Sequence, residues 1–347
     1  MSLLSGVSDF FGLDIGTSAI RLVQLRGNGP TKALVRYAYV LVDSKIAMSD
    51  SSIDQQKLAQ IIKELVDKSG VNTINAAVGL PSQRVFVTVA DMDHLSPGEL
   101  AKTIRYQADS LIPTPIDESK VDWAILGDSP QDKSKIEVLL ASVTNKYVEQ
   151  RLDLLESIGL NIIAFEPDSL SLVRALAAPE NMMAEMVLDI GAKATDLVIT
   201  LNGAPHLTRS IAGGSDAIVH SAMQNLNIED KQQAEQFVYK FGLTHQKLEG
   251  QVYQAIIGTV DQLINEIEKS IKFFTTRYTD AKLERIIVTG GASTLPEFPL
   301  YIANKFGMNV EIGNAWRNVS FMPDRQNELL SISNSFSIAV GLAERTA

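Results

Sequence analysis

The feature of this sequence that most constrains its fold is a short phrase that occurs twice. Residues 13–18 read Leu-Asp-Ile-Gly-Thr-Ser, and residues 188–195 read Leu-Asp-Ile-Gly-Ala-Lys-Ala-Thr. In each copy an apolar run precedes the Asp-Ile-Gly turn, a strand-like run follows it, and a turn containing Gly and Asn leads into a third run. Asn-Gly between alternating apolar residues, as at Asn202-Gly203, is a strong hairpin signal. The chain is therefore predicted to contain one three-stranded unit twice.

Each Asp-Ile-Gly turn has the chemistry of a magnesium–polyphosphate site. Glycine lets the backbone turn tightly and approach a bound group, and the N–H groups exposed at such a turn attract anions. The preceding carboxylate repels phosphate, but it can hold Mg²⁺ through water, because magnesium keeps several of its waters. Two facing hairpins would hold a polyphosphate from both sides, with Asp14 and Asp189 beside the metal. One such turn alone is more often an ordinary strand end, and the repetition favours the functional interpretation.

Composition limits the classes of protein that fit. The chain has 347 residues, enough for about two domains, and 45% of them are hydrophobic, so a large core is expected. The net charge is −10 and Lys and Arg are not clustered, which argues against direct binding to nucleic acid or to an anionic membrane. The absence of cysteine excludes disulfides, thiolate zinc sites and a Cys nucleophile, and it fits a cytosolic protein.

The beginning of the chain does not have the pattern of a targeting segment. Residues 1–11 lack the basic region of a signal peptide, and no apolar run approaches the ~18 residues of a membrane-spanning helix. The apolar residues among these eleven are expected to pack on the first domain. A docking or interfacial segment is the alternative, which the absence of Lys and Arg disfavours.

The first copy leads into a helix, a strand and a separate insert. Apolar residues at three- and four-residue spacing predict a helix over 54–69, which Gly70 ends, and a strand over 74–80 follows. Pro81 then opens an α+β insert, expected over residues 81–160. Its elements are a strand over 84–90, a helix over 96–111, strands over 121–126 and 136–143, and a helix over 144–158.

The second copy, from Met186, leads mainly into helices. A crossover over 162–178 is expected to return the chain to the first half before this copy begins. After its three strands, helices are predicted over 215–225, 234–241, 253–278, 298–306 and 335–344, and strands over 285–289 and 309–312.

Common catalytic and nucleotide-binding signatures are absent. The sequence has neither a P-loop nor the glycine fingerprint of dinucleotide-binding folds, and Gly-x-Ser-x-Gly does not occur. The four histidines, His94, His206, His220 and His245, show no metal-ligand spacing. What is present resembles the actin-like ATPase superfamily, which includes sugar kinases and chaperone ATPases. The two Asp-Ile-Gly turns resemble its phosphate-1 and phosphate-2 motifs, residues 165–168 its connect-1 motif and residues 287–293 its adenosine motif, in the expected order.

The insert narrows this resemblance to a family. An α+β insert at this place resembles FtsA, a cell-division protein, and PilM, of type IV pilus assembly. Residues 106–113 with 115–118, and residues 165–174, are similar to phrases of the PilM family. The chain also stops right after its last predicted helix, without the membrane-targeting helix typical of FtsA. The sequence is therefore identified as resembling the PilM family over residues 12–345.

The resemblance implies an actin-like ATPase fold: two duplicated β-β-β-α-β-α halves around a nucleotide cleft, with an FtsA-like α+β insert. We expect the first half (1A) to comprise residues 1–80 and 161–185, and the insert (1C) residues 81–160. The second half (2A) is expected over 186–215 and 280–347, with a helical subdomain (2B) over 216–279.

The resemblance also implies a site for ATP and Mg²⁺. Asp14 and Asp189 are assigned to the metal and its waters, and Gly213 and Gly214 to the sugar-phosphate side. The ribose is assigned to Glu235, and the adenosine to Gly290, Gly291 and Ser293. The phosphates are assigned to Gly16, Thr17, Ser18, Arg21, Gly191, Ala192 and Thr195. Arg21 stands where the family often has Lys, and Val238 stands where a Lys usually lies against the adenosine.

Hydrolysis would need a group that orients the attacking water. Glu166 is the first candidate, because connect 1 enters the cleft between the two hairpins, and Asp168 is the second, although it is equally suited to cap the next helix. Neither has a His or Lys nearby in sequence, so slow or absent hydrolysis is expected.

The function that follows is that of an ATP-binding scaffold. The resemblance implies a protein that is cytoplasmic and peripheral to the inner membrane, where it recruits the cytoplasmic N-terminal tail of a PilN-like inner-membrane protein and contacts other pilus platform proteins. An FtsA-like division protein that polymerises at the membrane is one alternative. A small-molecule kinase is a weaker one, because no further Asp base stands out in a polar loop.

Overall fold

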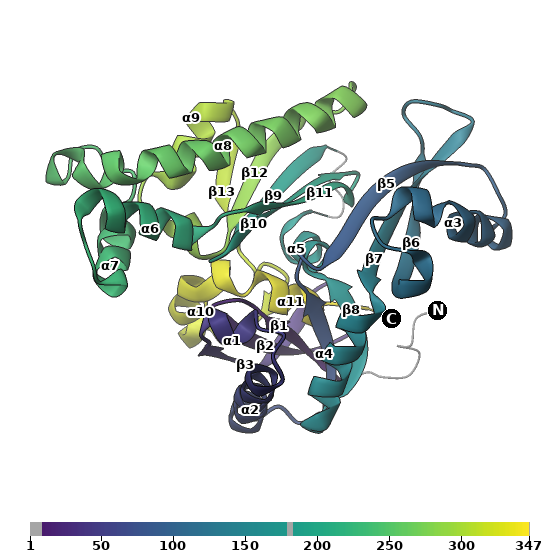
Figure 1. The fold of residues 1–347 in the computed structure, drawn as a ribbon, viewed down its shortest axis with the longest axis horizontal. Helices are drawn as coiled ribbons and strands as arrows, with labels where there is room; N and C mark the ends of the chain where they lie inside the picture. Colours follow the sequence, from purple (N-terminus) through teal and green to yellow (C-terminus); the bar gives the residue numbers. More distant parts are fainter. Residues whose placement is uncertain (1–8, 179–182, 347) are drawn as a thin grey trace.

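The computed structural model describes residues 9–178 and 183–346, in which three β-sheets organise the chain (Figure 1). Residues 1–8, most of the apolar segment whose packing was predicted, lie outside the described residues. No helix in the described ranges is both long and apolar enough to cross a bilayer.

The first half is a six-stranded sheet in the order β14-β3-β2-β1-β4-β8. Its strands are β1 (Phe11–Ile15), β2 (Ala19–Arg26), β3 (Lys32–Leu41), β4 (Asn75–Leu80), β8 (Asn161–Pro167) and β14 (Val319–Ser320). Helices of this half are α1 (Ser44–Ala47), α2 (Ser52–Ser69), α4 (Asn145–Ser157) and α5 (Asp168–Leu176). Ser51 caps α2, which begins two residues earlier than predicted, and Gly70, at φ 73°, ends it at the predicted place.

The second half is a five-stranded sheet in the order β11-β10-β9-β12-β13. Its strands are β9 (Ala184–Ile190), β10 (Ala194–Leu201), β11 (Ala204–Ala212), β12 (Leu283–Thr289) and β13 (Asn309–Ile312). Its helices are α6 (Ser215–Leu226), α7 (Lys231–Phe241), α8 (Gln251–Arg277) and α9 (Phe298–Phe306). Figure 1 shows α6 and α7 at the far end of this half from the insert, with α8 running the length of the sheet.

The two halves repeat one strand arrangement. In each, the first strand pairs antiparallel with the second and parallel with a strand after the next helices: β1 with β2 and β4, and β9 with β10 and β12. β1 and β9 are almost wholly buried, because other elements cover both faces of each strand. The duplication read from the Asp-Ile-Gly phrase is therefore present in the fold.

The C-terminal segment, which follows the second half in sequence, packs largely on the first half. Helices α10 (Gln326–Ile332) and α11 (Ser337–Ala343) follow β13, and β14 pairs with β3 of the first half. Trp316 and Phe336 are buried in one cluster with Val23 and Leu25 of β2. The expected 2A range of 280–347 is corrected accordingly, because the segment from about residue 315 buries its apolar side chains on the first half.

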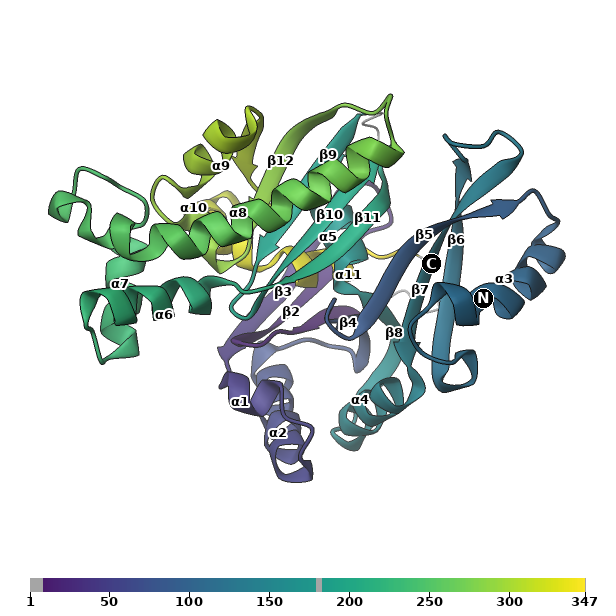
Figure 2. The same cartoon turned by 45° about the horizontal axis from the view of Figure 1, so that its top comes forward.

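The insert is smaller than expected. Its own sheet, in the order β5-β7-β6, comprises β5 (Val85–Asp93), β6 (Ser119–Asp128) and β7 (Lys135–Thr144), with α3 (Pro97–Leu111) packed on one face (Figure 2). Helix α4 was predicted to belong to it. Leu154 and Leu155 of α4 instead lie in the core of the first half with Leu58 and Ile62. The range 81–160 is therefore corrected to a core of about 85–144.

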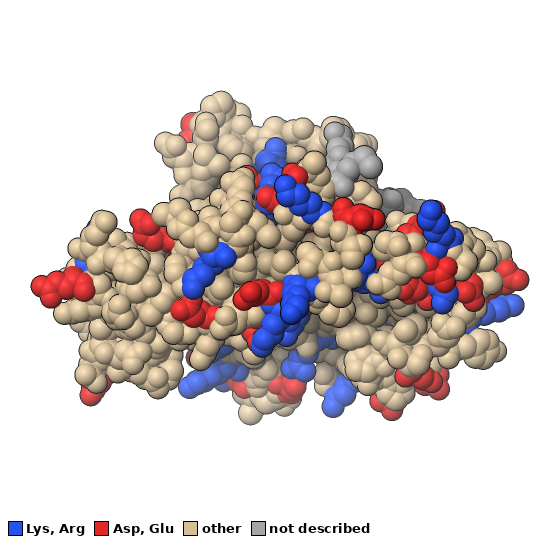
Figure 3. All heavy atoms as spheres, turned by 90° about the horizontal axis from the view of Figure 1, so that it is seen from above, with Lys and Arg blue, Asp and Glu red and all other residues tan. Residues whose placement is uncertain are grey.

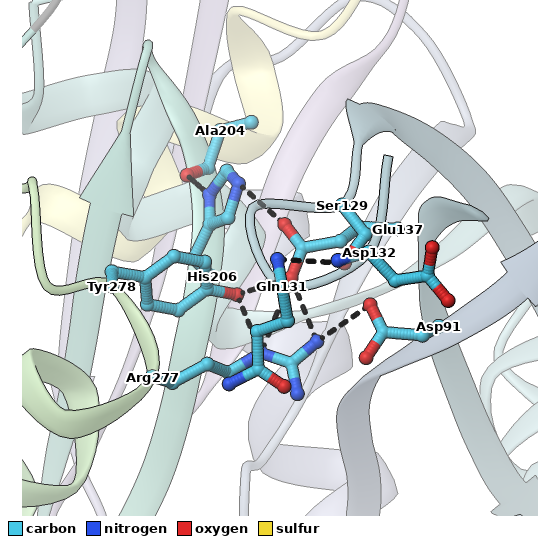
Figure 4. A network of polar contacts seen from close by, with 9 residues as sticks. All are labelled: Asp91, Ser129, Gln131, Asp132, Glu137, Ala204, His206, Arg277 and Tyr278. Carbon is cyan, nitrogen blue, oxygen red and sulfur yellow. Dashed lines mark hydrogen bonds and ion pairs between the residues drawn. The ribbon is translucent and has the colours of Figure 1, made fainter. Parts of the chain in front are cut away.

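A buried polar network joins the insert to the second half (Figure 4). Glu137 of β7, only 2% exposed, accepts hydrogen bonds from Arg277 Nη2 and the Tyr278 hydroxyl, both at 2.8 Å, and its Oε2 lies 3.5 Å from His206 Nε2. Arg277, at the end of α8, also pairs with Asp91 of β5 at 3.0 Å. The insert interrupts the first half in sequence, but this network attaches it to the second half in space.

Candidate functional site

A cleft of about 630 Å³ lies between the two halves and is lined by residues of both. The structure brings many of the residues predicted from the sequence to it. From the first hairpin these are Asp14, Gly16, Thr17, Ser18 and Arg21, and from the second Asp189, Gly191 and Ala192. Asp168, Glu235, Gly290 and Gly291 also line it.

The two hairpin turns have the same local geometry. A Cβ at Gly16 would lie 2.8 Å from the carbonyl oxygen of Ala19, and a Cβ at Gly191 would lie 3.1 Å from that of Ala194. The contact at Gly16 is closer than a Cβ accepts, so the first turn depends on glycine, whereas the contact at Gly191 is tight and a Cβ there would require a small shift of the Ala194 carbonyl. The N–H of Gly16 donates to Ala19 at 3.1 Å and closes the first turn. The turns therefore present backbone to the cleft, as an anion site requires.

The residues opposite the two aspartates differ between the hairpins. Asp14 faces Arg21 across the β1–β2 pair, and their charged atoms lie 3.3 Å apart. Asp189 faces Asp196 across the β9–β10 pair. The first carboxylate thus has a cationic partner, whereas the second has another carboxylate beside it.

Four carboxyl groups, Asp14, Asp168, Asp189 and Asp196, make the cleft strongly acidic. Burial raises the pKa of each of them. For Asp189, burial and then the charges of Asp196 and Asp14 raise the pKa to about 7. One oxygen of Asp168 is buried without a hydrogen-bond partner in the described chain. A cation in this cleft would relieve these costs.

The donor set fits magnesium, which prefers carboxylate oxygen and water. Among the described residues, no three acidic, His or Cys side chains lie close enough to hold one ion directly. The assignment of Asp14 and Asp189 to the ion and its waters stays a prediction. The ion would supply charge neutralisation for phosphates at the two turns.

The turn after β12 brings backbone against the second hairpin. Gly290 has φ 81°, and a Cβ there would lie 2.3 Å from Asp189 Oδ1. Its N–H donates to the Asn334 carbonyl at 2.7 Å, while its own carbonyl accepts from Ser293 Oγ at 2.7 Å. Ser293 therefore stabilises this turn from within and does not line the cleft.

Several predicted site residues lie elsewhere. Thr195 is fully buried and its hydroxyl donates to the Gly213 carbonyl at 2.9 Å. Gly213 and Gly214 line a separate cavity of about 420 Å³ beside α6 and α8. Gly214 is still needed locally, because a Cβ there would lie 2.1 Å from the carbonyl oxygen of Gly191. Val238 is buried in the core of the second half.

Glu166 is the largest departure from the predicted site. It is 2% exposed and does not line the cleft. Both its oxygens are bound by guanidinium groups, from Arg174 of α5 and from Arg345, the latter at 2.7 Å. Asp168, two residues later, does line the cleft. The structure thus brings the second candidate, and not the first, to the cleft.

Some cleft residues were not anticipated. Lys193 and Lys231 both pair with Asp216, at 2.8 and 3.0 Å, on the wall that also carries Glu235 and Tyr239. Lys193 lies inside the repeated phrase, so the sequence offered a signal for it. No local signal distinguishes the other residues.

The raised pKa of Asp189 gives a prediction without any ligand. A carboxyl whose folded pKa is about 7 binds protons more tightly in the folded state, so stability falls as pH rises from about 4 to 7 and the full penalty applies above 7. Asp189→Asn should therefore raise the unfolding free energy at pH 8 by about 2 kcal/mol, with little change at pH 4.5. Thermal unfolding at the two pH values measures this, and a variant that is destabilised at pH 8 would contradict it.

Charged side chains on the face seen in Figure 3 are mixed in sign. This face carries acidic and basic residues interspersed, without a continuous patch of either sign.

Comparison with known proteins shows which family this chain matches. The sequence model of the family described as "Type IV pilus assembly protein PilM" matches residues 12–347. A chain in the solved structure "PilM-PilN type IV pilus biogenesis complex" is 26% identical with a TM-score of 0.83, and the match covers 97% of this chain and 98% of that one.

More distant structures share the fold alone. The ethanolamine utilization protein EutJ of Carboxydothermus hydrogenoformans is 15% identical with a TM-score of 0.59, over 96% of this chain and 88% of that one. MreB5 of Spiroplasma citri, solved with AMPPNP, is 12% identical with a TM-score of 0.56, over 96% and 95%. The predicted actin-like ATPase fold is confirmed.

Proposed function

The chain belongs to the type IV pilus assembly protein PilM family, and on this premise we propose that it is a nucleotide-binding scaffold of a pilus assembly machine. It binds Mg²⁺ and ATP in the cleft between its halves and recruits the cytoplasmic N-terminal tail of a PilN-like inner-membrane protein. Through that tail and other platform proteins it is held at the cytoplasmic side of the inner membrane. The family match favours this function over the FtsA-like and kinase alternatives.

The observation that carries nucleotide binding is the pair of glycine turns that face one cleft with Asp14 and Asp189 beside them. Asp189→Ala should weaken magnesium-dependent ATP binding by about 2 kcal/mol or more, the scale of a lost charge-assisted contact. Titration calorimetry with and without Mg²⁺ measures the loss. Asp324→Ala, an exposed carboxylate outside the cleft, is the matched control. Equal affinity in wild type and Asp189→Ala would remove the basis for the two-hairpin site.

Partner recruitment is proposed on the similarity to a chain of the PilM-PilN complex over nearly the full length of both. The tail, with an Asn-Leu-Leu-Pro type of sequence, is expected to dock between the first half and the insert. Hydrogen exchange of the full chain with a tail peptide should show protection at the junction over residues 81–86 and 111–121. A peptide with Asp in place of both Leu is the control. Protection confined to the second half would contradict this docking place.

Turnover is expected to be slow, and Asp168 is the residue proposed to orient water. It lines the cleft with an unpartnered oxygen, whereas the oxygens of Glu166 are bound by two arginines. Asp168→Asn should lower the rate of phosphate release about tenfold or more with ATP affinity kept. Glu166→Gln should mainly lower the melting temperature, because it leaves Arg174 and Arg345 without their counter-charge. A Glu166 variant that folds and binds ATP but has lost turnover would reverse this assignment.

A further inference from the structure

One arginine beside the cleft is buried without a counter-charge. Arg151 of α4 is 9% exposed, and no carboxylate of the described residues lies within ion-pair distance of it. Its Nη2 donates to the Tyr147 hydroxyl at 3.2 Å, whereas its Nη1 is buried with no hydrogen-bond partner in the described chain. A buried guanidinium costs several kcal/mol unless an anion compensates it. Such a residue points to an anionic ligand.

A second arginine lies on the same aromatic ring. The guanidinium carbons of Arg84 and Arg151 lie 5.3 and 5.4 Å from the centroid of the Tyr147 ring. Two cationic side chains are thus gathered around one ring at the cleft, where an anion would compensate their charge. The only ion pair of Arg84 in the described chain, with Asp50 at 3.5 Å, joins two exposed side chains and contributes little.

Arg84 and Arg151 line the cleft that the first glycine turn also lines. β1 and β4 are parallel neighbours, with Leu13 opposite Val78, so the turn after β1 and the segment after β4 leave the sheet at the same edge. Gly16 belongs to the turn after β1, and Arg84 belongs to the segment after β4. In that second segment the backbone N–H of Arg84 donates to the Pro81 carbonyl. Arg84, Tyr147 and Arg151 line the same cleft as the two glycine turns.

We propose that Arg84, Tyr147 and Arg151 form a subsite for a phosphoryl group, supplied either as the terminal phosphate of the bound nucleotide or as free phosphate. Arginine suits this ligand because its planar donors match phosphate oxygens. The inference rests on the proposed nucleotide site and deepens it, because it assigns discrimination between ATP and ADP to residues outside both Asp-Ile-Gly turns. Arg151 lies on α4 and Arg84 directly precedes β5, so the subsite also joins the first half to the start of the insert.

The test compares ATP with ADP in the full-length protein. Arg151→Gln and Arg84→Gln should each weaken magnesium-dependent ATP binding about tenfold or more and change ADP affinity less than twofold. Arg105→Gln, on the exposed surface of α3, makes the same charge change away from the cleft and is the control. Unchanged ADP affinity also shows that the variants are folded, and Arg84, being exposed, provides a variant that does not disturb a core.

A second experiment uses inorganic phosphate alone and measures the melting temperature of wild type and the two variants. If free phosphate is the ligand, it raises the melting temperature of wild type but not of the two variants, while their ATP affinity is unchanged. Loss in either arm supports the subsite and identifies the source. Equal losses for ATP and ADP, or no loss in either arm, overturn it. If wild type binds neither nucleotide, the proposed function fails, and the phosphate arm alone decides the inference.

Discussion

Glu137→Ala should lower the free energy of unfolding by about 3 kcal/mol or more, because it removes the central acceptor of a buried ion-pair network. Glu137 is 2% exposed and accepts from Arg277 and Tyr278, so the variant would leave the Tyr278 hydroxyl without its acceptor and Arg277 with Asp91 as its remaining partner. Burial, and then the hydrogen bond to Glu137, raise the pKa of the Tyr278 hydroxyl, which keeps it a donor. Urea unfolding measures the loss.

The matched control is Glu328→Ala. Glu328 is exposed and pairs with Arg325 three residues away, so its loss should change stability by less than about 0.5 kcal/mol. Glu137→Gln keeps the shape and one acceptor, and its effect should lie between the two. Limited proteolysis should show earlier cleavage around the insert in Glu137→Ala, because the network joins the insert to the second half (Figure 4). Equal stability of the Glu137 and Glu328 variants would show that the network does not hold the insert.

Gly290→Ala should lower the affinity for Mg²⁺-ATP at least about 100-fold, roughly 2.7 kcal/mol. Its Cβ would lie 2.3 Å from Asp189 Oδ1 and 2.5 Å from the Ile190 carbonyl oxygen, at a φ of 81° that side chains rarely adopt. The backbone contact cannot be relieved by a rotamer change, so the turn must move away from the second hairpin and displace Asp189. Calorimetry with Mg²⁺ and ATP measures this effect.

Gly307→Ala separates the cost of backbone conformation from the cost of the contact. Gly307 also has a positive φ, 64°, but a Cβ there meets nothing within 4 Å. It should lose about 1 kcal/mol of stability and keep its nucleotide affinity. If the two glycine variants behave alike in binding, the close approach of Gly290 to Asp189 has no role in the site.

Local chemistry explains why much of the fold could be read in advance. The alternation of strands, the stop of α2 at Gly70 and the two Asp-Ile-Gly turns are each set by a few consecutive residues. The duplication then placed Asp14 and Asp189 on one cleft, because equivalent strands end at equivalent places. The same local pattern could not show that Thr195 and Ser293 do not line the cleft. A hydroxyl can donate to a ligand or to a backbone carbonyl, and in the structure both donate to backbone carbonyls.

What the sequence by itself determined is the repeated hairpin, the order of most elements and the presence of Asp14 and Asp189 at one cleft. Only the tertiary structure decided that Glu166 is held by Arg174 and Arg345, and that α4 and the last helices pack on the first half. It also joined Glu137 to Arg277, 140 residues away. The physical reason is that hydrogen bonding and chain geometry act between near neighbours in sequence, whereas burial and the pairing of charges depend on which surfaces meet when the chain is packed.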